Sequence, residues 1–419
     1  MSGDGNPVLV IGGGIAGITT AVEAAEAGCD VILVERSPWL GGRVAQMNQY
    51  FPKLCPPACG LELNFRRIKS NPRIKVLTQA RVESLTGVRG NYEAAIAIAP
   101  RCVNEACTAC GACAEVCPAE RRDDFNYGLA KTKAAYLAHP FAFPARYAID
   151  RNACPKNCQA CADACKYNTI ELNQQPARTT VRVAAVVAAT GWAPYDAARL
   201  DNLGFGKFPN VVTNVMLERM AARDGPTQGR ILRPSDGQEP RSVVFVQCAG
   251  SRDENHLPYC SAVCCTASLK QCAYIRALYP VAEIAVFYID IRTPGLLEEF
   301  FTKVSGDGKL RLVKGKVAKV EGDAATGDLR VTAEDVLSGV KATTIANLLV
   351  LATGMMPQTD DLPPGFTLDE FRFVTNGGGS GLYAAGCAKR PAEVSGTVQD
   401  ATGAALKALQ CVVRSGGSA

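Results

Sequence analysis

Eight cysteines in two closely spaced runs constrain this chain more than any other feature of its sequence. The first run reads C-x2-C-x2-C-x3-C followed by proline, at Cys107, Cys110, Cys113, Cys117 and Pro118. The second run repeats this spacing with one extra residue in its first gap, at Cys154, Cys158, Cys161 and Cys165. Repeated short spacings of this kind are typical of metal-ligating thiols rather than of packing residues.

The first spacing is the one that holds four-iron clusters in bacterial two-cluster ferredoxins, where the fourth cysteine of each run ligates the other cluster. It predicts a ferredoxin insert with two [4Fe–4S] clusters over residues 101–172. One cluster takes Cys107, Cys110, Cys113 and Cys165, and the other takes Cys154, Cys158, Cys161 and Cys117. A zinc knuckle is the alternative, since closely spaced cysteine pairs also bind zinc. Eight ligands in two crossed quartets favour the clusters.

The remaining composition is that of a globular protein. The 419 residues predict two or three domains, and 47% hydrophobic and 20% charged residues are enough for a sizeable core. We find no secretory leader, so we expect the 19 cysteines to lie in a reducing, cytoplasmic compartment. The net charge of +5, without a basic run interleaved with aromatics, argues against nucleic acid. No apolar stretch approaches the roughly 20 residues that span a bilayer.

A dinucleotide-binding unit opens the chain. Residues 8–11 predict a buried strand, and the Gly-x-Gly-x-x-Gly motif at Gly12, Gly14 and Gly17 leads into a helix over residues 15–27. A second strand over residues 30–34 ends at Glu35, which lies 18 residues after Gly17, where a carboxylate can bind ribose hydroxyls. The glycines permit a tight turn, close approach of a pyrophosphate and packing of helix on strand.

FAD is the expected dinucleotide because buried strands that end in a glycine turn recur later in the chain. Two strands end in Ala-Thr-Gly, at residues 189–191 and 352–354, and a last strand closes on Gly386 before a helix over residues 398–413. This pattern resembles the two-dinucleotide-domain flavoproteins of the thioredoxin-reductase-like class, in which an aspartate for the flavin ribityl chain stands where Cys387 stands here. The predicted FAD contacts are Gly12, Gly14, Ile15, Ala16, Gly17, Glu35, Arg36, Gly42, Arg43, Val82, Thr190, Gly191, Gly386, Cys387 and Gln399.

The expected fold is therefore α/β, with an FAD-binding domain in three parts (residues 1–100, 173–240 and 353–419) interrupted by the insert and by a second Rossmann-like domain (residues 241–352). That second domain lacks the phosphate-cradling glycines. Its first strand, residues 242–247, runs into Cys248, and Cys260, Cys264 and Cys265 follow before a helix over residues 266–278. These thiols predict a third cluster in place of an NAD(P) site, and buried free thiols are the alternative.

Residues 246–253 and 259–265, with Lys270 and Gln271, resemble the A subunit of heterodisulfide reductase, as do residues 225–227, 233–237 and 287–292. The resemblance covers essentially the whole chain. It implies that Cys248, Cys260, Cys264 and Cys265 bind a [4Fe–4S] cluster beside the flavin, giving three clusters in all, and that Lys270 approaches flavin N5. It also implies an oxidoreductase subunit that is active only in a complex and forms a homodimer.

Residues 50–62 and 64–69 resemble a narrower group, the A subunit of the quinone-interacting membrane-bound oxidoreductase complex. This implies three partners: adenylylsulfate reductase as the soluble sulfur enzyme, a second flavin and iron–sulfur subunit, and a membrane quinone-reactive subunit. The protein would then be cytoplasmic and peripheral to the inner membrane. The alternative within the family is a sulfur-oxidation or electron-bifurcating complex.

Cys55 and Cys59 form a C-x3-C pair in a proline-rich loop. They could form a redox disulfide beside the flavin, ligate an extra metal or cluster, or be structural free thiols. With the first role, the chain would be an NAD(P)H-dependent disulfide reductase, which the missing second glycine motif opposes. A scaffold with a vestigial flavin is a further alternative. We interpret Cys29, Cys102, Cys272 and Cys411 as packing or bystander residues.

Overall fold

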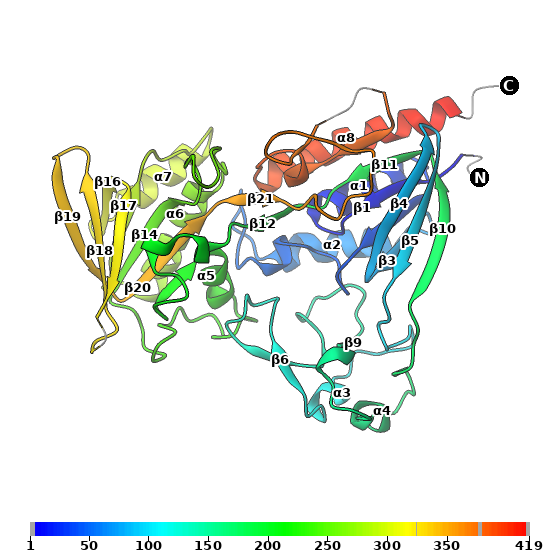
Figure 1. Cartoon of the computed structure of the whole chain (residues 1–419), viewed down its shortest axis with the longest axis horizontal. Helices are drawn as coiled ribbons and strands as arrows, with labels where there is room; N and C mark the ends of the chain where they lie inside the picture. The colour runs from blue at the N-terminus through cyan, green and yellow to red at the C-terminus, as the bar shows by residue number, and fades with distance from the viewer. Residues whose placement is uncertain (1–4, 324, 376–378, 416–419) are drawn as a thin grey trace. The chain divides into compact units, whose positions relative to one another are not determined.

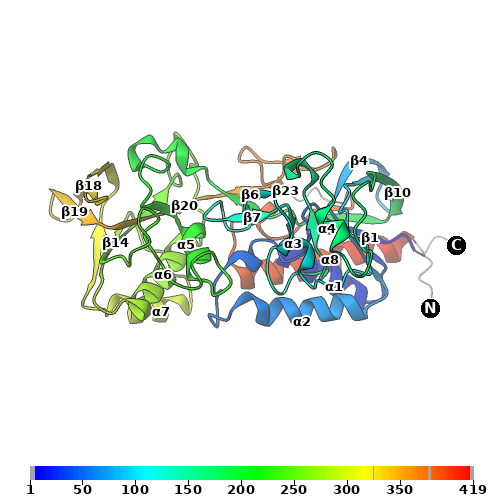
Figure 2. The ribbon, with the colours of Figure 1, turned by 90° about the horizontal axis from the view of Figure 1, so that it is seen from below.

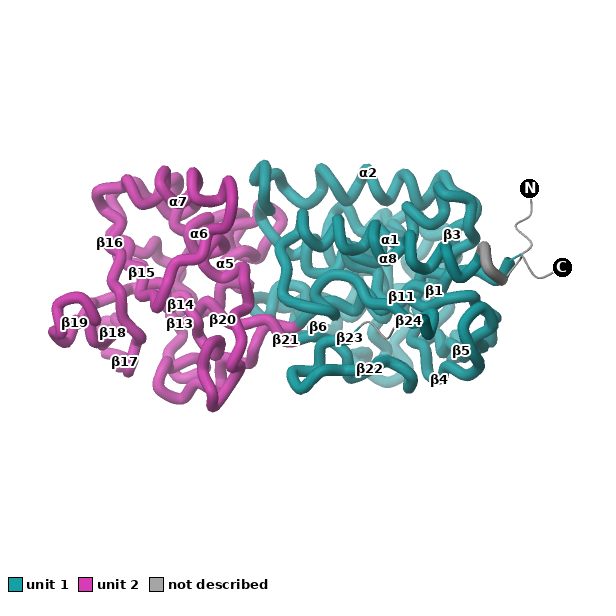
Figure 3. The backbone as a smooth tube through the Cα atoms, turned by 90° about the horizontal axis from the view of Figure 1, so that it is seen from above, with its two compact units in different colours: residues 1–192, 357–419 teal, residues 193–356 magenta. Residues whose placement is uncertain are grey.

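The computed structural model describes residues 5–323, 325–375 and 379–415 of the chain, and the chain divides into two compact units. Unit 1 comprises residues 1–192 and 357–419, and unit 2 comprises residues 193–356 (Figure 3). The chain passes between them in β12 (Trp192–Pro194) and β21 (Met355–Pro357). Residues 193–240, expected in the FAD-binding domain, lie in unit 2. The predicted five-part division is finer than these two units and stays a prediction.

A five-stranded parallel sheet forms the centre of unit 1. Its order is β24 (Leu382–Ala384), β11 (Ala185–Ala188), β1 (Val8–Ile11), β2 (Val31–Glu35) and β3 (Ile74–Thr78). Residues in β1, β2 and β11 are buried throughout, which is why these strands read as continuous apolar runs in the sequence.

Alternate side chains of this sheet belong to two different cores. Val8, Val10 and Leu33 pack with α1 (Ile15–Glu26), α2 (Pro57–Ser70) and α8 (Val394–Ser415). Leu9 and Ile32 pack instead with the antiparallel sheet of β10 (Ala177–Val183), β5 (Asn91–Ile98) and β4 (Ala80–Val88). Figure 2 shows the three helices on one side of unit 1 and β4 and β10 on the other. Unit 1 also contains β22 (Thr367–Leu368), β23 (Val374–Thr375), η1 (Val44–Gln46) and η5 (Gly386–Ala388).

The cysteine-rich insert is a part of unit 1 and connects two paired strands. Ile98 of β5 is opposite Ala177 of β10, so the segment between them extends from the end of a β-hairpin (Figure 1). It holds two one-turn helices, two short hairpins and a 3-10 turn: α3 (Ala112–Glu115), α4 (Ala160–Asp163), β6 (Glu120–Arg122) with β7 (Lys131–Lys133), β8 (Ala135–Tyr136) with β9 (Ala148–Ile149), and η2 (Arg151–Ala153). Its small core contains Cys113, Cys117 and Cys161. That this insert is a ferredoxin domain stays a prediction.

Unit 2 repeats the layout of unit 1. Its parallel sheet has the order β13 (Val211–Thr213), β20 (Leu348–Thr353), β14 (Ser242–Ala249), β15 (Glu283–Tyr288) and β16 (Leu310–Lys314). An antiparallel sheet of β17 (Val317–Gly322), β18 (Leu329–Asp335) and β19 (Val340–Ala346) shares a core with it. The helices and 3-10 turns are α5 (Asn214–Ala221), α6 (Cys264–Leu278), α7 (Leu297–Ser305), η3 (Ala197–Arg199) and η4 (Asp201–Leu203). Within the described part of the chain, no helix is long and apolar enough to cross a membrane.

A substitution at Gly17 tests how closely α1 must approach β1. A Cβ atom on Gly17 would lie 1.8 Å from the Gly12 carbonyl oxygen, so Gly17→Ala must displace the backbone of the turn. We expect a destabilisation of about 2 kcal/mol or more, measured as a lower thermal unfolding midpoint. The control is Gly403→Ala in α8, where a Cβ meets no described atom within 4 Å and helix propensity favours alanine. Equal unfolding midpoints in the two variants would contradict this account.

Candidate functional site

Three adjacent strands of unit 1 end at one edge of the sheet, and each is followed by predicted FAD contacts. Gly12 follows β1, Thr190 and Gly191 follow β11, and Gly386 follows β24. The carboxyl ends of parallel strands are where ligands of open α/β sheets bind. The sheet therefore brings together loops that lie far apart in the sequence.

Backbone fills the space at the glycine loop. Gly12 has φ +111°, and a Cβ atom there would lie 2.3 Å from the carbonyl oxygen of Ala189. Gly14 is the N-cap of α1 and offers no side-chain capping bond, so the first amides of the helix, at Ile15, Ala16 and Gly17, have no side-chain partner there. Such a helix N-terminus is suited to bind a phosphate.

A glycine pair from another segment, Gly41 and Gly42, packs against this loop. The Gly41 amide donates to the Gly13 carbonyl oxygen at 2.8 Å. A Cβ atom on Gly42, which has φ +53°, would lie 2.8 Å from the Gly14 Cα atom. The predicted contact Gly42 is thus beside the glycine loop, and Arg43 is the next residue of the chain.

Glu35 is a buried carboxylate at the end of β2. Its Oε2 accepts a hydrogen bond from the Gly13 amide at 2.6 Å, and its Oε1 accepts one from the Ser37 amide at 2.7 Å. Its neighbour Arg36 is exposed and forms an ion pair with Asp361 at 3.5 Å, whereas Val82 is buried between the two sheets. The FAD contacts predicted for these three residues stay predictions.

Two further observations fit a bound dinucleotide at this edge. The Oγ1 atom of Thr190 is buried and has no hydrogen-bond partner among the described residues. Gly191, with φ +73°, has no described atom within 4 Å of the position that a Cβ would take. A buried, unpaired hydroxyl beside open space and a helix N-terminus suits a polar ligand. The residues present therefore fit FAD.

The loop after β24 is bonded to a carboxylate of α8, Asp400, that the sequence did not point to. The Gly386 amide donates to Asp400 Oδ2 at 2.9 Å, and Lys389 Nζ contacts Asp400 Oδ1 at 2.7 Å. Cys387 is buried, and its Sγ is 3.4 Å from the Ala392 carbonyl oxygen, while Gln399 is exposed. Asp400 follows Gly386 by 14 residues, so no local motif connects the two.

The cysteines of the insert lie close to one another. Burial raises the pKa of the Cys113 thiol to about 12, and the charges of Cys107 and Cys161 add to the shift. Burial also raises the pKa of Cys154, with smaller contributions from Cys117 and Cys158. Cys117 of the first run is thus a neighbour of the second run, which crossed ligation requires.

Cys110 and Cys165 are the remaining two of the eight predicted ligands. Cys165 Sγ lies 3.2 Å from the Thr169 hydroxyl, and Cys110 is exposed. Among the described residues, no three Cys, His, Asp or Glu side chains form a site for a single metal ion. Cluster ligation by the eight cysteines stays a prediction.

Four thiols gather at the carboxyl end of β14 in unit 2. Cys248 is the next-to-last residue of the strand and has φ +56°, and Cys260 lies in the connecting loop. Cys264 and Cys265 lie in the first turn of α6, which begins two residues earlier than predicted. Burial raises the pKa of Cys248 to about 11, and Cys265 and Cys260 add to the shift. Burial and the thiols of Cys248, Cys265 and Cys260 also raise the pKa of Cys264.

The loop around these thiols is fixed by hydrogen bonds. Ser261 Oγ lies 2.9 Å from Ser251 Oγ and accepts from the Met355 amide at 2.8 Å. Cys264 Sγ and Cys265 Sγ each lie 3.6 Å from a carbonyl oxygen, of Thr353 and Asp290 respectively. The thiols thus occupy the edge of the sheet where a second dinucleotide would otherwise bind.

Lys270 forms a buried ion pair that the sequence did not reveal. Its Nζ atom lies 3.1 Å from Glu218 Oε1, and both side chains are less than a tenth exposed. The same carboxylate oxygen accepts from Gln271 Nε2 at 2.8 Å, and the Lys270 ammonium lies 5.8 Å from the centre of the Tyr274 ring. The predicted flavin contact of Lys270 stays a prediction.

Cys55 and Cys59 flank the start of α2. Cys59 is exposed and Cys55 is half-buried. Burial raises the pKa of the Tyr50 phenol, and the charges of both thiols raise it further, so all three groups are neighbours. The three interpretations of the pair remain open. The bystander cysteines include Cys102, Cys272 and Cys411, which are buried, and Cys29, which is half-buried.

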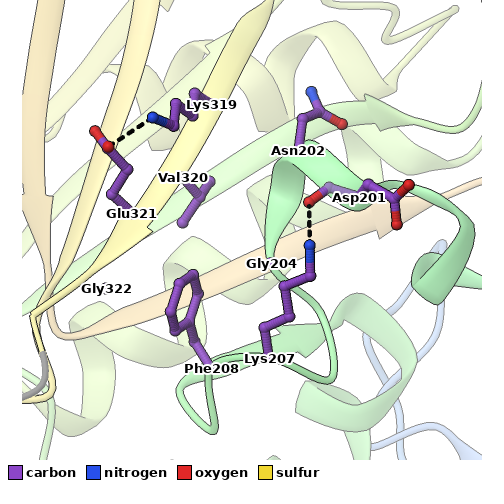
Figure 4. A pocket seen from close by; sticks show the side chains of 9 residues that line it. All are labelled: Asp201, Asn202, Gly204, Lys207, Phe208, Lys319, Val320, Glu321 and Gly322. Carbon is purple, nitrogen blue, oxygen red and sulfur yellow. Dashed lines mark hydrogen bonds and ion pairs between the residues drawn. The ribbon is translucent and has the colours of Figure 1, made fainter.

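A hollow of about 360 Å³ lies elsewhere on unit 2 (Figure 4). It is lined by Asp201, Asn202, Gly204, Lys207, Phe208, Lys319, Val320, Glu321 and Gly322. Its cations are already engaged, since Lys319 pairs with Glu321 at 2.6 Å and Lys207 donates to the Asp201 carbonyl oxygen. No predicted site residue lines it, and we do not assign it a function.

Comparisons with known proteins agree with this geometry. The family model described as FAD dependent oxidoreductase matches residues 7–96. The chain is 36% identical over 416 residues to the iron–sulfur A subunit of CoB–CoM heterodisulfide reductase from Methanocaldococcus jannaschii, covering 95% of this chain and 63% of the relative. It is 35% identical to the A subunit of H2:CoB–CoM heterodisulfide,ferredoxin reductase from Methanothermobacter marburgensis, covering 97% of this chain and 64% of the relative. The chain thus spans less than two thirds of these relatives.

Solved structures confirm the expected fold. Thioredoxin reductase of T. acidophilum superposes with a TM-score of 0.53 at 14% identity, covering 97% of this chain and 99% of that chain. The Lactococcus lactis thioredoxin reductase gives a TM-score of 0.52 at 12% identity, covering 98% of this chain and 99% of that chain. The chain is therefore an α/β protein of the two-dinucleotide-domain type. At this level of identity the likeness concerns the fold alone.

The thiols of unit 2 can be tested by comparing two cysteines of α6. We expect Cys264→Ala to lower the iron content of anaerobically purified protein by about four atoms, because a four-iron cluster needs its thiolates. Cys272→Ala is the control, since Cys272 is equally buried two turns further along the same helix. Iron analysis that shows equal loss, or no loss, in both variants would argue against a cluster at this position.

Proposed function

Because the chain is similar to the heterodisulfide reductase A subunit over nearly the whole of its own length, we propose that it is a member of that family and an FAD and iron–sulfur electron-transfer subunit of a multi-subunit oxidoreductase. The observation that carries this proposal is the contrast between two equivalent sheet edges. The edge in unit 1 has the glycines of a dinucleotide site, and the edge in unit 2 has four thiols. A thiol-lined edge suits a redox cluster better than a nicotinamide dinucleotide.

The roles of the residues follow from this assignment. Bound FAD exchanges electrons in pairs and [4Fe–4S] clusters exchange them singly, so together they convert one kind of transfer into the other. The glycine loop and the N-terminus of α1 would bind the pyrophosphate, and Glu35 the ribose. The four thiols of unit 2 would hold one cluster, and the eight cysteines of the insert two more.

We further propose a role in a membrane-associated complex of sulfur metabolism. The proposal is supported by the likeness of residues 50–62 and 64–69 to the A subunit of the quinone-interacting oxidoreductase complex. The partners would be adenylylsulfate reductase, a second flavin and iron–sulfur subunit, and a membrane quinone-reactive subunit. The protein would be cytoplasmic and peripheral to the inner membrane, and a homodimer is the proposed oligomer.

Two other functions have some support. A subunit of an electron-bifurcating or sulfur-oxidation complex is the first, and the name of the Methanothermobacter marburgensis relative, a heterodisulfide,ferredoxin reductase, places that relative in a complex with two acceptors in its name. The C-x3-C pair Cys55 and Cys59, which follows the glycine pair Gly41 and Gly42, supports an NAD(P)H-dependent disulfide reductase. The second of these is opposed by the end of β14 and the turn that follows it, which lack the Gly-x-Gly-x-x-Gly motif of a nicotinamide-binding domain.

Cofactor analysis with a reduction test distinguishes these functions. We expect anaerobically purified protein to contain one FAD and about twelve iron atoms, and its flavin absorption to persist when NADH or NADPH is added. Rapid bleaching by either nucleotide would favour the disulfide reductase. About four iron atoms with stable flavin would contradict cluster binding by the insert. Protein without FAD would contradict the whole proposal.

The predicted role of Lys270 is tested by the flavin midpoint potential. A cation near flavin N5 stabilises the reduced form, so Lys270→Ala should lower the potential. Lys270→Ala leaves Glu218 buried without its cation. The double variant Lys270→Met with Glu218→Gln, which removes both charges, should therefore be measured as well. Lys303→Ala in α7, an exposed position, is the control. An unchanged flavin titration in both Lys270 variants would exclude the role.

A further inference from the structure

The segment that carries Gly41 and Gly42 is held on one side by the glycine loop and along its length by the cysteine-rich insert. Arg101 Nη1 donates to the Pro38 carbonyl oxygen at 2.8 Å, and Trp39 Nε1 donates to the Arg146 carbonyl oxygen at 3.0 Å. The Leu40 amide donates to the Phe143 carbonyl oxygen at 2.8 Å. The insert is thus bonded to three successive residues that precede the glycine pair.

One loop of the insert, residues 123–128 between β6 and β7, continues these contacts. Asp123 organises the loop: its Oδ1 accepts from the Phe125 amide at 3.1 Å and its Oδ2 from Asn126 Nδ2 at 2.6 Å. The Gly128 amide donates to the Asp123 carbonyl oxygen at 2.8 Å. Tyr127 has φ +53°, a conformation that non-glycine residues adopt at a cost. The loop is therefore a built structure that presents Tyr127.

Tyr127 contacts Arg43, the residue that follows the glycine pair. Arg43 Nη1 donates to the Tyr127 hydroxyl at 3.0 Å, and Arg43 Nε donates to the Trp192 carbonyl oxygen at 3.1 Å. The guanidinium lies 5.6 Å from the centre of the Tyr127 ring and 5.5 Å from that of Trp192, within the range of cation–π attraction. The side chain is therefore held from the insert and from Trp192, the first residue of β12.

Gln46 joins the same group of hydrogen bonds. Its Oε1 accepts from Arg43 Nη1 at 3.2 Å and from the Tyr127 hydroxyl at 3.1 Å. Its Nε2 donates to the Phe125 carbonyl oxygen at 2.9 Å. The Tyr127 hydroxyl thus accepts from Arg43 and donates to Gln46, and phenylalanine could do neither.

We propose that the insert completes the flavin site, and that Tyr127 is a positioning residue that fixes the Arg43 guanidinium beside the bound flavin. The proposal rests on the proposed FAD site in unit 1. It assigns the insert a part in flavin binding in addition to electron transfer. Because Arg43 is a fixed cation, its placement affects both the affinity for FAD and the relative stability of oxidised and reduced flavin.

The test compares Tyr127→Phe with Tyr167→Phe in anaerobically purified full-length protein. Tyr167 is also in the insert, but 57% of it is exposed. Tyr127→Phe should weaken FAD binding by about three- to tenfold, the usual effect of losing one or two hydrogen bonds. It should also lower the flavin potential. A threefold change in the ratio of the affinities for oxidised and reduced flavin corresponds to about 14 mV. The iron content should stay at the wild-type value, and Tyr167→Phe should change none of these.

A double-mutant cycle with Arg43→Lys shows whether Tyr127 acts through Arg43. If it does, Tyr127→Phe should have little further effect once Arg43 is replaced. Unchanged FAD affinity and potential in Tyr127→Phe would overturn the proposal, as would fully additive effects or an equal loss of FAD in Tyr167→Phe. Wild-type protein without FAD would overturn the proposed function as well, so the two failures are distinguishable.

Discussion

Close contact between backbone segments at the glycine loop is the constraint on which unit 1 depends. The chain after β1 must pass within contact of Ala189, and the first turn of α1 must pass within contact of Gly12, so no side chain fits at Gly12 or Gly17. Gly42 then lies against Gly14 from a third segment. The segments can meet this closely because Gly12, Gly17 and Gly42 carry no side chain, and the same closeness leaves amides available for a phosphate.

Unit 2 has the same arrangement of strands but a different chemistry at the equivalent edge. Cys248, the next-to-last residue of β14, has φ +56°, a left-handed conformation that usually favours glycine. Burial raises the pKa of the thiols there, which means that the thiolate needs a nearby cation to form. Iron would supply that charge, as would the N-terminus of α6 to a smaller extent. One scaffold thus supports two kinds of site, decided by a few residues at the strand ends.

The strands and the glycine motif could be predicted because their signals are local. A buried parallel strand is a continuous apolar run, and the boundaries of β1 agree with the prediction. The ion pair of Lys270 with Glu218, the bond of Asp400 to Gly386 and the contact of Tyr127 with Arg43 could not be predicted, since 52, 14 and 84 residues separate the partners. Such pairs depend on how elements pack, which spacing and periodicity do not encode.

The contacts of the insert with residues 38–40 and with Arg43 would connect its stability to that of the proposed flavin site. The core of the insert consists mainly of alanine and cysteine, with Val103 and Ile149 as the only larger aliphatic side chains among its described, fully buried residues. A core this small rarely stabilises a domain without metal or covalent cross-links. Under the proposed cofactor assignment, the clusters would supply that stability, and the bonds to residues 38–40 and to Arg43 would transmit it to the glycine pair. Because the insert leaves a hairpin formed by β5 and β10, it could be acquired without disturbing the parallel sheet. The insert would then contribute to the flavin site through these contacts and not through the parallel sheet.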